Sequence, residues 1–461
     1  MPKPNSIKAF LQQPISIAPL VFLRVLFGGV MLASIIRFVA NGWIESQYIQ
    51  PDFFFKYYGF EWVTAPGEWG IYALFAFMGG SAIFIMLGFL YRYAALAFFL
   101  AFTYVELIDV SNYLNHYYFI SIMALLLVFV PANRNFSLDV LINPKSKRSH
   151  IPRWIILIFQ VQLGIVYFYA GLAKLNYDWL INAEPMRIWL PAKSDMFLIG
   201  PLFKELWVAY FFSWAGAIYD LSIVFFLSFS RTRPFAYLSV LFFHLMTAAL
   251  FQIGMFPYIM ILLTLIFFPP AFHERILARV KAIFKINTEE FIQPRLWQIS
   301  TLKLNILGVL LIGHFAFQLL FPFRFALYPG NLFWTEEGYR FSWRVMLMEK
   351  AGTCFFYVTN PETGKSTEVE PNEYLSKNQE KMMATQPDMI LQFAHYLKDI
   401  YREKGIENPE VRVKSYVRLN GNGSRLFIDP EVNLATIQDG FRHKNWILPF
   451  TNPQNFTAQK Q

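Results

Sequence analysis

Ionisable side chains within long apolar segments are the features of this sequence most able to do chemistry. A charged group left in hydrocarbon costs several kcal/mol, so such a residue is usually paired or functional. An amine, a carboxylate or an imidazole held there can also transfer a proton. The main candidates are Arg24, Arg37, Glu106, Asp109, Lys174, Asp220 and His244, with His116 at the boundary of a segment.

Lys174 is the first of these candidates because of the residues that precede it. The segment from Tyr167 to Lys174 reads Tyr-Phe-Tyr-Ala-Gly-Leu-Ala-Lys, in which small residues allow close helix approach and aromatic rings exclude water. Such surroundings favour an uncharged amine, which is a base. The alternative, more common on position alone, is a lysine whose flexible side chain extends to the membrane interface.

Asn115, His116 and His244 are the polar residues that could act together with Lys174. A single histidine within a span is more often a hydrogen-bond donor between packed helices than a catalytic group. The topology predicted below, however, places Asn115, His116 and Lys174 at the same membrane face. This convergence favours a shared site over unrelated packing residues.

Asp220 and Cys354 are predicted to have structural rather than chemical roles. Asp220 lies in the middle of its apolar segment, and we expect it to pair with an arginine such as Arg37 rather than to do chemistry. Cys354 is the only cysteine, which excludes an intrachain disulfide and a metal site built from several cysteines. The sequence also lacks a Walker loop, a strand followed by GxGxxG, and the HExxH and GxSxG motifs, so we expect no metal.

The segments that carry these residues are predicted to cross a membrane. Of 461 residues, 56% are hydrophobic and 15% are charged, whereas soluble domains carry about 25% charge. Runs such as 235–269 are long enough for ~30 Å of hydrocarbon at ~1.5 Å per helical residue. Aromatic residues make up 19%, which suits both interface belts and cavities for flat rings. The nine predicted spans are at about 17–40, 70–90, 93–110, 117–131, 154–175, 206–229, 234–252, 255–269 and 301–321.

The net charge of +9 reflects membrane topology rather than nucleic-acid binding. Residues 1–321 hold 23 Lys and Arg against 15 Asp and Glu, and residues 322–461 hold 17 against 16. Basic loops stay in the cytoplasm, so the N-terminus is predicted to be cytoplasmic. The predicted fold is therefore a polytopic α-helical membrane domain in residues 1–321, followed by an extracytoplasmic domain in residues 322–461. The predicted inside loops, rich in Lys and Arg, are 132–153, 230–233 and 270–300.

Residues 322–461 have the composition of a soluble domain, and we predict a sheet-rich α+β fold. Phe341–Glu349 and Thr353–Thr359 read as strands, and Pro361–Gly364 supplies a turn before another extended piece. A clearer hairpin spans 411–428, because its Asn-Gly-Asn-Gly turn suits positive φ. Between them lies an amphipathic helix that stops at a glycine. Its apolar stripe is Ile390, Phe393, Ala394, Leu397 and Tyr401.

Four blocks of the chain, in order, resemble the vitamin K-dependent gamma-glutamyl carboxylases and their microbial relatives. The resemblance covers roughly residues 15–450, and four blocks in one order are more than a chance match would supply. Each block also contains residues that the preceding paragraphs single out, or lies at the start of the outer domain. The blocks are Asn115–Tyr118, Tyr167–Leu175 with Asp178-Trp179, Phe243–Phe256, and Leu327–Gly330 with Trp334–Arg344.

The resemblance implies an enzyme, a peptidyl-glutamate carboxylase with vitamin K epoxidase activity. A glutamate γ-hydrogen is too weakly acidic for any side-chain base, so a stronger base has to be made in the site. In the family, the amine that corresponds to Lys174 deprotonates vitamin K hydroquinone, a reduced naphthoquinone. Reaction with dioxygen then yields the strong base and finally the epoxide, and carbon dioxide traps the glutamyl carbanion. An aromatic, water-poor chamber would protect both reactive species from protonation.

The resemblance also implies partners and co-substrates. The partners are the lipid bilayer, the naphthoquinol and a Glu-containing protein or peptide, and no nucleic acid is expected. The cofactor is vitamin K hydroquinone, with dioxygen and carbon dioxide as co-substrates and without a metal. The chain is accordingly expected to be an integral multi-pass membrane protein that meets its peptide substrate on the extracytoplasmic side.

The same resemblance implies roles for the remaining site residues. Asn115 and His116 would hydrogen-bond the quinol or the oxyanion formed from it, and His244 would help to position the quinol. Trp343 and Arg344 would hold the glutamyl substrate, with Arg344 as the carboxylate partner. Both lie in the first predicted strand of the outer domain. Neighbouring side chains of a strand point to opposite faces, so at most one of the two should reach the site directly.

Two other functions stay open on the sequence alone. A quinol oxygenase without a glutamate substrate would need Lys174 but neither Trp343 nor Arg344. A non-enzymatic quinone or lipid carrier would tolerate the loss of Lys174. Arg344 itself has the alternative of an ordinary ion pair on the surface of the outer domain, which contributes little. Its candidate partners there are Glu336, Glu337 and Glu349.

Overall fold

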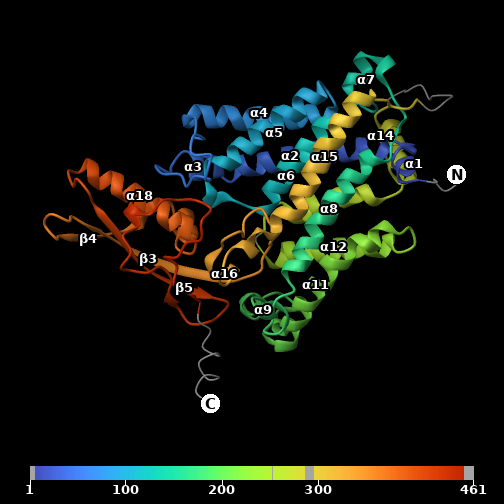
Figure 1. Ribbon diagram of the computed structural model, residues 1–461. Coiled ribbons are helices and arrows are strands. Elements are labelled where there is room, and N and C mark those ends of the chain that lie inside the picture. Colours follow the sequence, from blue (N-terminus) through green and yellow to red (C-terminus); the bar gives the residue numbers. More distant parts are fainter. Residues whose placement is uncertain (1–5, 252, 286–294, 451–461) are drawn as a thin grey trace.

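The computed structural model describes residues 6–251, 253–285 and 295–450, which form a helical bundle joined to a sheet-containing domain (Figure 1). Figure 1 shows the first helix, at Ile7–Leu11, at one end of the bundle and the sheet at the other. The ends of the two predicted domains, residues 1–5 and 451–461, lie outside the described residues, and the boundary at 321/322 stays a prediction.

The predicted architecture of a polytopic membrane protein with a C-terminal sheet domain is confirmed. Among the described residues, seven helices are long and apolar enough to span a membrane. The predicted span at 117–131 is a helix of only 15 residues, and the one at 255–269 is a helix that bends by 112° into the next. The helices at the predicted spans are α2 (Ala18–Ala40), α4 (Gly67–Leu87), α5 (Tyr91–Ile108), α6 (Asn115–Phe129), α8 (Trp154–Ala173), α11 (Leu206–Ser228), α12 (Arg233–Leu250), α13 (Phe256–Leu263) and α15 (Thr301–Leu320).

Shorter helices connect the spans and begin the outer domain. Most of them lie in the loops at the two ends of the bundle. The short α-helices of this part are α1 (Ile7–Leu11), α3 (Trp43–Tyr48), α7 (Leu138–Ile142), α9 (Tyr177–Leu180), α10 (Met186–Trp189), α14 (Pro270–Ile283) and α16 (Leu332–Thr335). The 3-10 turns are η1 (Val110–Asn112), η2 (Pro144–Ser146), η3 (Pro191–Lys193), η4 (Gly200–Lys204), η5 (Thr264–Phe267) and η6 (Phe321–Leu327).

Arg24 shows why a charged residue can lie deep within α2. Its guanidinium donates to the carbonyl oxygens of Ile85 and Met86 at 3.0 Å, where α4 ends, and to that of Phe136 at 2.5 Å. The last carbonyls of a helix lack the usual amide partner one turn further on. The helix α4 stops at Gly88, which has a φ of 67° and whose amide donates to the carbonyl of Ile85, so Arg24 supplies additional donors at this helix end. Arg24 is therefore a structural cap that joins three segments.

Residues predicted to lie inside gather at the end of the bundle opposite the sheet. Strand β1 (Pro14–Ser16) pairs antiparallel with β2 (His150–Pro152), and the amide of Trp297 donates to the carbonyl of His150 at 2.8 Å. The N-terminal segment and two of the predicted inside loops thus meet at one end. Figure 1 places α1, α7 and α14 there as well.

The outer domain contains a four-stranded antiparallel sheet in the order β4-β3-β5-β6. Strands β3 and β5 pair along their whole length, from Lys350 opposite Leu419 to Thr359 opposite Glu410. The predicted helix is confirmed as α18, and its stripe from Ile390 to Leu397 is buried. The elements are β3 (Lys350–Thr359), β4 (Ser366–Val369), η7 (Pro371–Glu373), α17 (Lys377–Met383), α18 (Pro387–Glu403), β5 (Glu410–Leu419), β6 (Arg425–Leu426) and η8 (Leu434–Thr436).

The predicted strand at Phe341–Glu349 is wrong. The segment follows an irregular path in which Phe341, Trp343 and Met346 have φ values of 57°, 58° and 51°. These values lie in the left-handed region, which no strand contains and which non-glycine residues rarely adopt. Partners from the bundle hold the backbone of this segment in another conformation, as described below.

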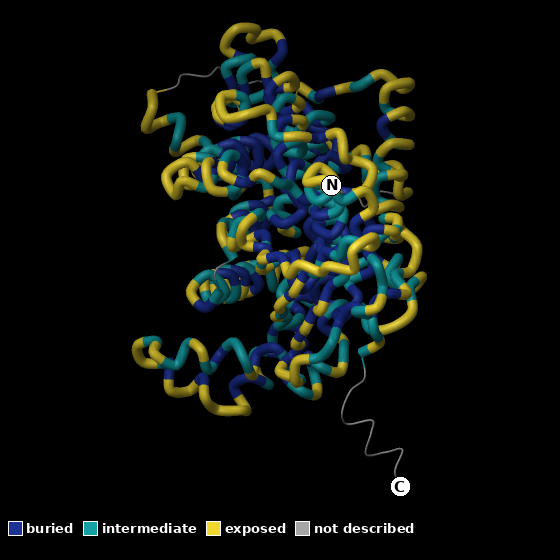
Figure 2. The backbone as a smooth tube through the Cα atoms, turned by 90° about the vertical axis from the view of Figure 1, so that its left-hand side faces the viewer, coloured by how far each residue is buried: buried dark blue, intermediate teal, exposed yellow. Residues whose placement is uncertain are grey.

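Two glutamines fix the outer domain onto the loops of the bundle. Gln379 on α17 donates to the carbonyl of Phe53 at 2.6 Å and to the carboxylate of Asp109 at 2.9 Å. The amide of Gln392 on α18 exchanges two hydrogen bonds, of 2.8 and 2.9 Å, with the backbone of Lys56. Figure 2 shows buried residues in both parts of the molecule, and one cluster of buried side chains joins Phe55 and Leu250 of the bundle to Phe356 of the sheet.

Candidate active site

Two cavities of different character adjoin each other at the junction of the bundle and the outer domain. The first, the inner cavity, has a volume of about 610 Å³ and is enclosed mainly by α8, α11, α12 and α13. The second, the outer cavity, has a volume of about 1090 Å³ and lies between the bundle and the outer domain. Both volumes suit small-molecule sites. The residues common to both walls are Phe251, Ile253, Phe256, Val345 and Met346.

Lys174 lies in the inner cavity, where its amine forms a buried ion pair. It follows the last residue of α8, and its Nζ lies 2.6 Å from Oδ2 of Asp220 on α11. The two residues are 6% and 5% exposed. Nζ also donates to the carbonyl of Ala170 at 3.2 Å, and it lies 5.3 Å from the ring centroid of Trp179. Lys174 therefore points into the protein and does not extend to the interface.

The prediction that Asp220 pairs with Arg37 is wrong, because α11 packs along α8. Their close approach is possible at Gly171, where a Cβ atom would lie 2.8 Å from the backbone nitrogen of Leu221. Gly171 precedes Lys174 by one turn, and Leu221 follows Asp220. The missing side chain of this glycine therefore brings the amine and the carboxylate together.

We expect Gly171→Ala to destabilise the protein by about 1–3 kcal/mol, the usual cost of overpacking. The methyl group meets backbone, which cannot move aside as a flexible side chain can. Thermal unfolding in detergent measures the effect. Gly164→Ala is the matched control on the same helix, since its Cβ would lie an ordinary 3.5 Å from Val224. Equal melting temperatures for the two variants would contradict this explanation of the helix contact.

His244 on α12 provides the second polar group of the inner cavity. Its Nε2 lies 2.8 Å from the hydroxyl of Tyr167, which joins α12 to α8. Its Nδ1 is buried and has no hydrogen-bond partner among the described residues. An unsatisfied buried polar atom is costly. His244 therefore joins two packed helices by a hydrogen bond, the more common role considered for it from the sequence. Its second ring nitrogen remains available to a ligand.

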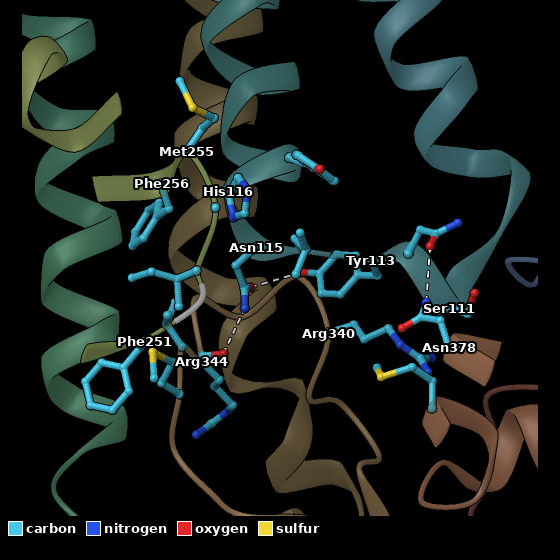
Figure 3. A pocket seen from close by; sticks show the side chains of 18 of the residues that line it. Ser111, Tyr113, Asn115, His116, Phe251, Met255, Phe256, Arg340, Arg344 and Asn378 are labelled. Atoms are coloured by element: carbon cyan, nitrogen blue, oxygen red, sulfur yellow. Dashed lines mark hydrogen bonds between the residues drawn. The ribbon is translucent and has the colours of Figure 1, made fainter. Parts of the chain in front are cut away.

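Asn115 begins α6 and lies on the wall of the outer cavity (Figure 3). Its Nδ2 donates to the carbonyl of Arg344 at 2.8 Å, and its Oδ1 accepts from the hydroxyl of Tyr113 at 3.0 Å. Because α6 has only 15 residues, about 22 Å at ~1.5 Å each, it cannot cross ~30 Å of hydrocarbon. Its first turn is thus available to line a cavity.

His116 faces the outer cavity and is separated from His244 by one aromatic ring. The His116 ring lies 5.6 Å from the ring of Phe256, which in turn lies 6.1 Å from the ring of His244. Phe256 lines both cavities. The structure therefore brings Lys174 and His244 together in the inner cavity. It places Asn115 and His116 on the other side of a shared wall.

Residues 338–346, here named the site loop, are held in their irregular conformation by side chains outside it. The amide of Phe341 donates to the hydroxyl of Tyr113 at 2.7 Å. Arg324 on η6 donates to the carbonyl of Arg340 and to the hydroxyl of Ser342, and Asn115 donates to the carbonyl of Arg344. Left-handed residues cost energy and persist only where surrounding contacts fix them, most often at functional sites.

Trp343 and Arg344 point in different directions, although not because of a strand. The Trp343 ring is 1% exposed and stacks on Tyr118 of α6 at 4.9 Å between centroids, away from the cavities. Arg344 lines the outer cavity, and its guanidinium carbon lies 4.5 Å from the ring centroid of Phe325. In this arrangement Arg344 can touch a ligand, and Trp343 supports the loop from behind.

None of the three acidic residues proposed as surface partners pairs with Arg344. Glu336 binds Lys350 at 2.8 Å, Glu337 binds His443 at 2.9 Å, and Glu349 binds Arg418 at 3.1 Å. Among the described residues, Arg344 has no carboxylate partner, and its Nε has no hydrogen bond. Burial lowers the pKa of Arg344. A carboxylate ligand would relieve the cost of holding this charge there.

The outer cavity is electropositive. Two of its cations are neutralised, Arg340 by Asp388 and Lys350 by Glu336. Arg344 and Arg37, the latter stacked on a tryptophan of α3, are not paired with a carboxylate among the described residues. Helices α6 and α13 both begin at this cavity without a side-chain cap, and free amides at a helix N-terminus favour an anion.

Several residues of the site were not predicted from the sequence. Tyr113 precedes the Asn-His pair by two residues and could have been found as a polar group beside it. Arg37 was expected to pair with Asp220 and not to line a cavity. The wall residues Val345 and Met346 carry no chemical signal, because aliphatic side chains become a partition only when two distant segments meet.

Comparisons with known proteins match both parts of the chain. Residues 12–272, more than half of its length, match the family model of the HTTM domain. Residues 303–453 match the model of the vitamin K-dependent gamma-carboxylase lumenal domain. The second match begins within α15 and covers the site loop. No solved structure matches the chain.

Proposed function

The chain belongs to the vitamin K-dependent gamma-glutamyl carboxylase family, and from this premise we propose a membrane enzyme that couples quinol epoxidation to carboxylation of protein glutamate. The inner cavity takes vitamin K hydroquinone, and the outer cavity takes the glutamyl side chain. The observation that carries the proposal is the pair of adjoining cavities that differ in charge. In the inner one the only cation, Lys174, is paired with Asp220, whereas the outer one holds two arginines without a carboxylate partner among the described residues.

The residues of the inner cavity fit a reduced naphthoquinone. Aromatic side chains from α11 and α12 suit a flat ring, and Lys174 and His244 offer two polar contacts to its hydroxyl groups. The buried Nδ1 of His244, which has no hydrogen-bond partner among the described residues, is placed to bind one of these hydroxyl groups. When bound, the quinol supplies, on reaction with dioxygen, the base that a glutamate γ-hydrogen requires. Lys174 accepts the hydroxyl proton that must leave first.

Asp220 is the residue that allows Lys174 to act as a base. An ammonium cannot accept a proton, so Lys174 has to pass one on before it takes one from the quinol. Oδ2 of Asp220 lies 2.6 Å from Nζ of Lys174 and can accept this proton directly. Asp220 thereby also holds the amine beside the cavity. We assign it as a positioning residue and proton acceptor, in place of the structural role that the sequence favoured.

In the outer cavity, Arg344 binds the glutamyl carboxylate, and Trp343 fixes the loop that presents it. Arginine is suited to this task because its planar guanidinium matches a carboxylate with two hydrogen bonds. Asn115 acts on the substrate indirectly, through the carbonyl of Arg344. His116 lies where the two cavities meet, beside Phe256. The apolar residues common to both cavities would keep water away from the place where the reduced quinol and the glutamyl side chain have to meet.

One experiment separates this function from its alternatives. Purified protein is incubated with reduced vitamin K, labelled carbon dioxide and a Glu-containing peptide, and the label and the epoxide are followed separately. We expect both products, with carboxylation dependent on the quinol. Epoxide without label would favour the quinol oxygenase. Neither product, together with saturable quinol binding, would favour the carrier.

We propose that the outer domain lies outside the cytoplasm with the N-terminus inside, on the basis of the basic loops. Ser424 and Ser230 are both exposed and lie in loops predicted on opposite sides. Ser424→Cys should react with an impermeant thiol reagent in intact cells, and Ser230→Cys only after lysis. The parent chain is the blank, since Cys354 is buried. Reversed labelling would contradict the proposed orientation.

A further inference from the structure

We propose that α14 lies in the membrane–water interface and that its residues Arg275 and Arg279 bind the headgroups of anionic phospholipids. This site is independent of the proposed function. It also goes beyond the predicted topology, because a basic loop only has to stay on one side of the membrane. A lipid site has in addition a defined helix, a depth and a preference for one kind of headgroup.

The bend before α14 turns the chain away from the direction of the preceding helix. Helix α13 and turn η5 end at Phe267, and α14 begins at Pro270 at an angle of 112° to them. Pro269 and Pro270 cannot continue a helix, because neither has an amide hydrogen to donate. His273 fixes the corner, since its ring nitrogens lie 3.2 and 3.1 Å from the carbonyl oxygens of Pro269 and Leu265.

The contacts of α14 place it near the end of a span. The helix packs against α2, and the ring centroid of His273 lies 5.2 Å from that of Phe22. Phe22 is the fifth residue of α2, about 6 Å from the start of that helix at ~1.5 Å per residue. Figure 1 shows α14 at the end of the bundle opposite the sheet. This is the depth at which amphipathic helices lie in a membrane surface.

The remaining residues of α14 divide into three sides, because residues four or seven apart share a side of a helix. His273 and Leu277 face the bundle. Arg275 and Arg279 are exposed on the side away from it. Between these two sides lie an apolar one and a mostly polar one. The apolar side is Phe272, Ile276 and Ile283, and the other is Glu274, Ala278 and Ala282, all three exposed.

Only one orientation of these sides suits a membrane surface. The apolar side turns toward the hydrocarbon, the side with Glu274 turns toward water, and the two arginines extend along the surface at the level of the headgroups. Ile283 and Phe284 are 75% and 70% exposed, and the hydrocarbon is what covers them in this orientation. A basic amphipathic helix binds a membrane surface in the same way.

The charges of α14 favour an anionic lipid over a zwitterionic one. Among the described residues, neither Arg275 nor Arg279 forms an ion pair with a carboxylate. Glu274 is the one acidic residue of the helix. A guanidinium group matches a phosphate with two hydrogen bonds. Because the two arginines are one turn apart, both can contact the same headgroup or two neighbouring ones.

Lipid binding to the purified, delipidated protein tests this preference. The Kd values of phosphatidylglycerol and of phosphatidylcholine with the same acyl chains are measured by native mass spectrometry. We expect the parent to bind phosphatidylglycerol about tenfold or more tightly. Arg275→Gln/Arg279→Gln should bind both lipids alike. Arg275→Lys/Arg279→Lys retains the charges and should keep most of the preference.

Arg92→Gln/Arg231→Gln is the charge-matched control. Both arginines are exposed, in the first turn of α5 and in the loop between α11 and α12. The control should keep the preference of the parent. An equal loss in the control and in Arg275→Gln/Arg279→Gln would overturn the proposal, because net charge alone would then explain the binding. Displacement of the lipid by an equal concentration of glycerol phosphate would also overturn it, because the site would then bind a free anion.

Spin labels test the orientation of α14 in vesicles that contain phosphatidylglycerol. Labels are attached to Ile283→Cys and Ala278→Cys, and the parent chain is the blank because Cys354 is buried. The first label should collide mainly with dissolved oxygen, which concentrates in hydrocarbon, and the second mainly with a water-soluble nickel complex. Two labels that are equally accessible to the nickel complex would overturn the interfacial position. Neither measurement requires turnover, so a protein that makes no epoxide would leave this test intact.

Discussion

Replacing Lys174 with alanine is expected to stop epoxide formation and carboxylation together, with turnover lower by roughly 10²–10⁴-fold, the usual contribution of a positioned acid or base. Both reactions depend on the proton that its amine removes from the quinol. Small exogenous amines should restore part of the epoxide, because the variant leaves space beside Asp220. Epoxide and labelled peptide are measured by chromatography. Lys204→Ala, at an exposed lysine outside both cavities, should retain full activity.

Loss of activity in this variant must be separated from loss of structure, since removing one partner of a buried ion pair costs on the order of 3–5 kcal/mol. The double variant Lys174→Met/Asp220→Leu removes both charges and fills the space. It should unfold at nearly the temperature of the parent protein and still make no epoxide. Asp220→Asn alone should lose most of its epoxidation and, unlike Lys174→Ala, should gain nothing from added amines. Parental epoxidation by the double variant would show that neither residue takes part in the chemistry.

Arg344→Ala is expected to impair carboxylation while epoxidation without peptide persists. A hydrogen bond between charged groups contributes about 1.5–3 kcal/mol, so the KM for a Glu-containing peptide should rise by about tenfold or more. The reason is that Arg344 lines the outer cavity and has no carboxylate partner among the described residues. Peptide KM and peptide-independent epoxide formation are measured on the same preparation.

Arg418→Ala is the control for Arg344→Ala. Arg418 forms an exposed ion pair with Glu349 in the same domain and lies outside the cavities, and such pairs contribute little. Its peptide KM should match that of the parent. A parallel loss of carboxylation and epoxidation in Arg344→Ala would instead show that Arg344 supports the quinol site or the fold.

Features that depend on neighbours in the chain could be predicted from the sequence. The spans follow from apolar runs, and α18 follows from the buried stripe between Ile390 and Leu397. The hairpin of β5 and β6 follows from an Asn-Gly turn between two extended segments. The candidate residues Lys174, Asn115 and His116 were found because polar groups are rare in such segments.

Features that depend on contacts between distant segments could not be predicted. The partner of Asp220 depends on which helix packs against α11, and that choice is made at Gly171 by the absence of a side chain. The strand expected at Phe341–Glu349 does not form, because Tyr113 and Asn115 bind the backbone of this segment. The division into two cavities arises from a wall to which two distant segments contribute, residues 251–256 and residues 345–346.

The residues that hold the site loop in place link the two parts of the chain that match different family models. Two family models divide it between residues 272 and 303, as though a membrane module and an outer module had been joined. The loop belongs to the second module, but Tyr113, Asn115 and Tyr118 belong to the first. A chimera that carries this outer module on a foreign bundle would keep the sheet and lose the loop, unless all three positions were transplanted with it. A substitution at one of these contacts in the first module therefore requires a matching substitution in the second. For example, a substitution in α6 can be compensated by one in the site loop.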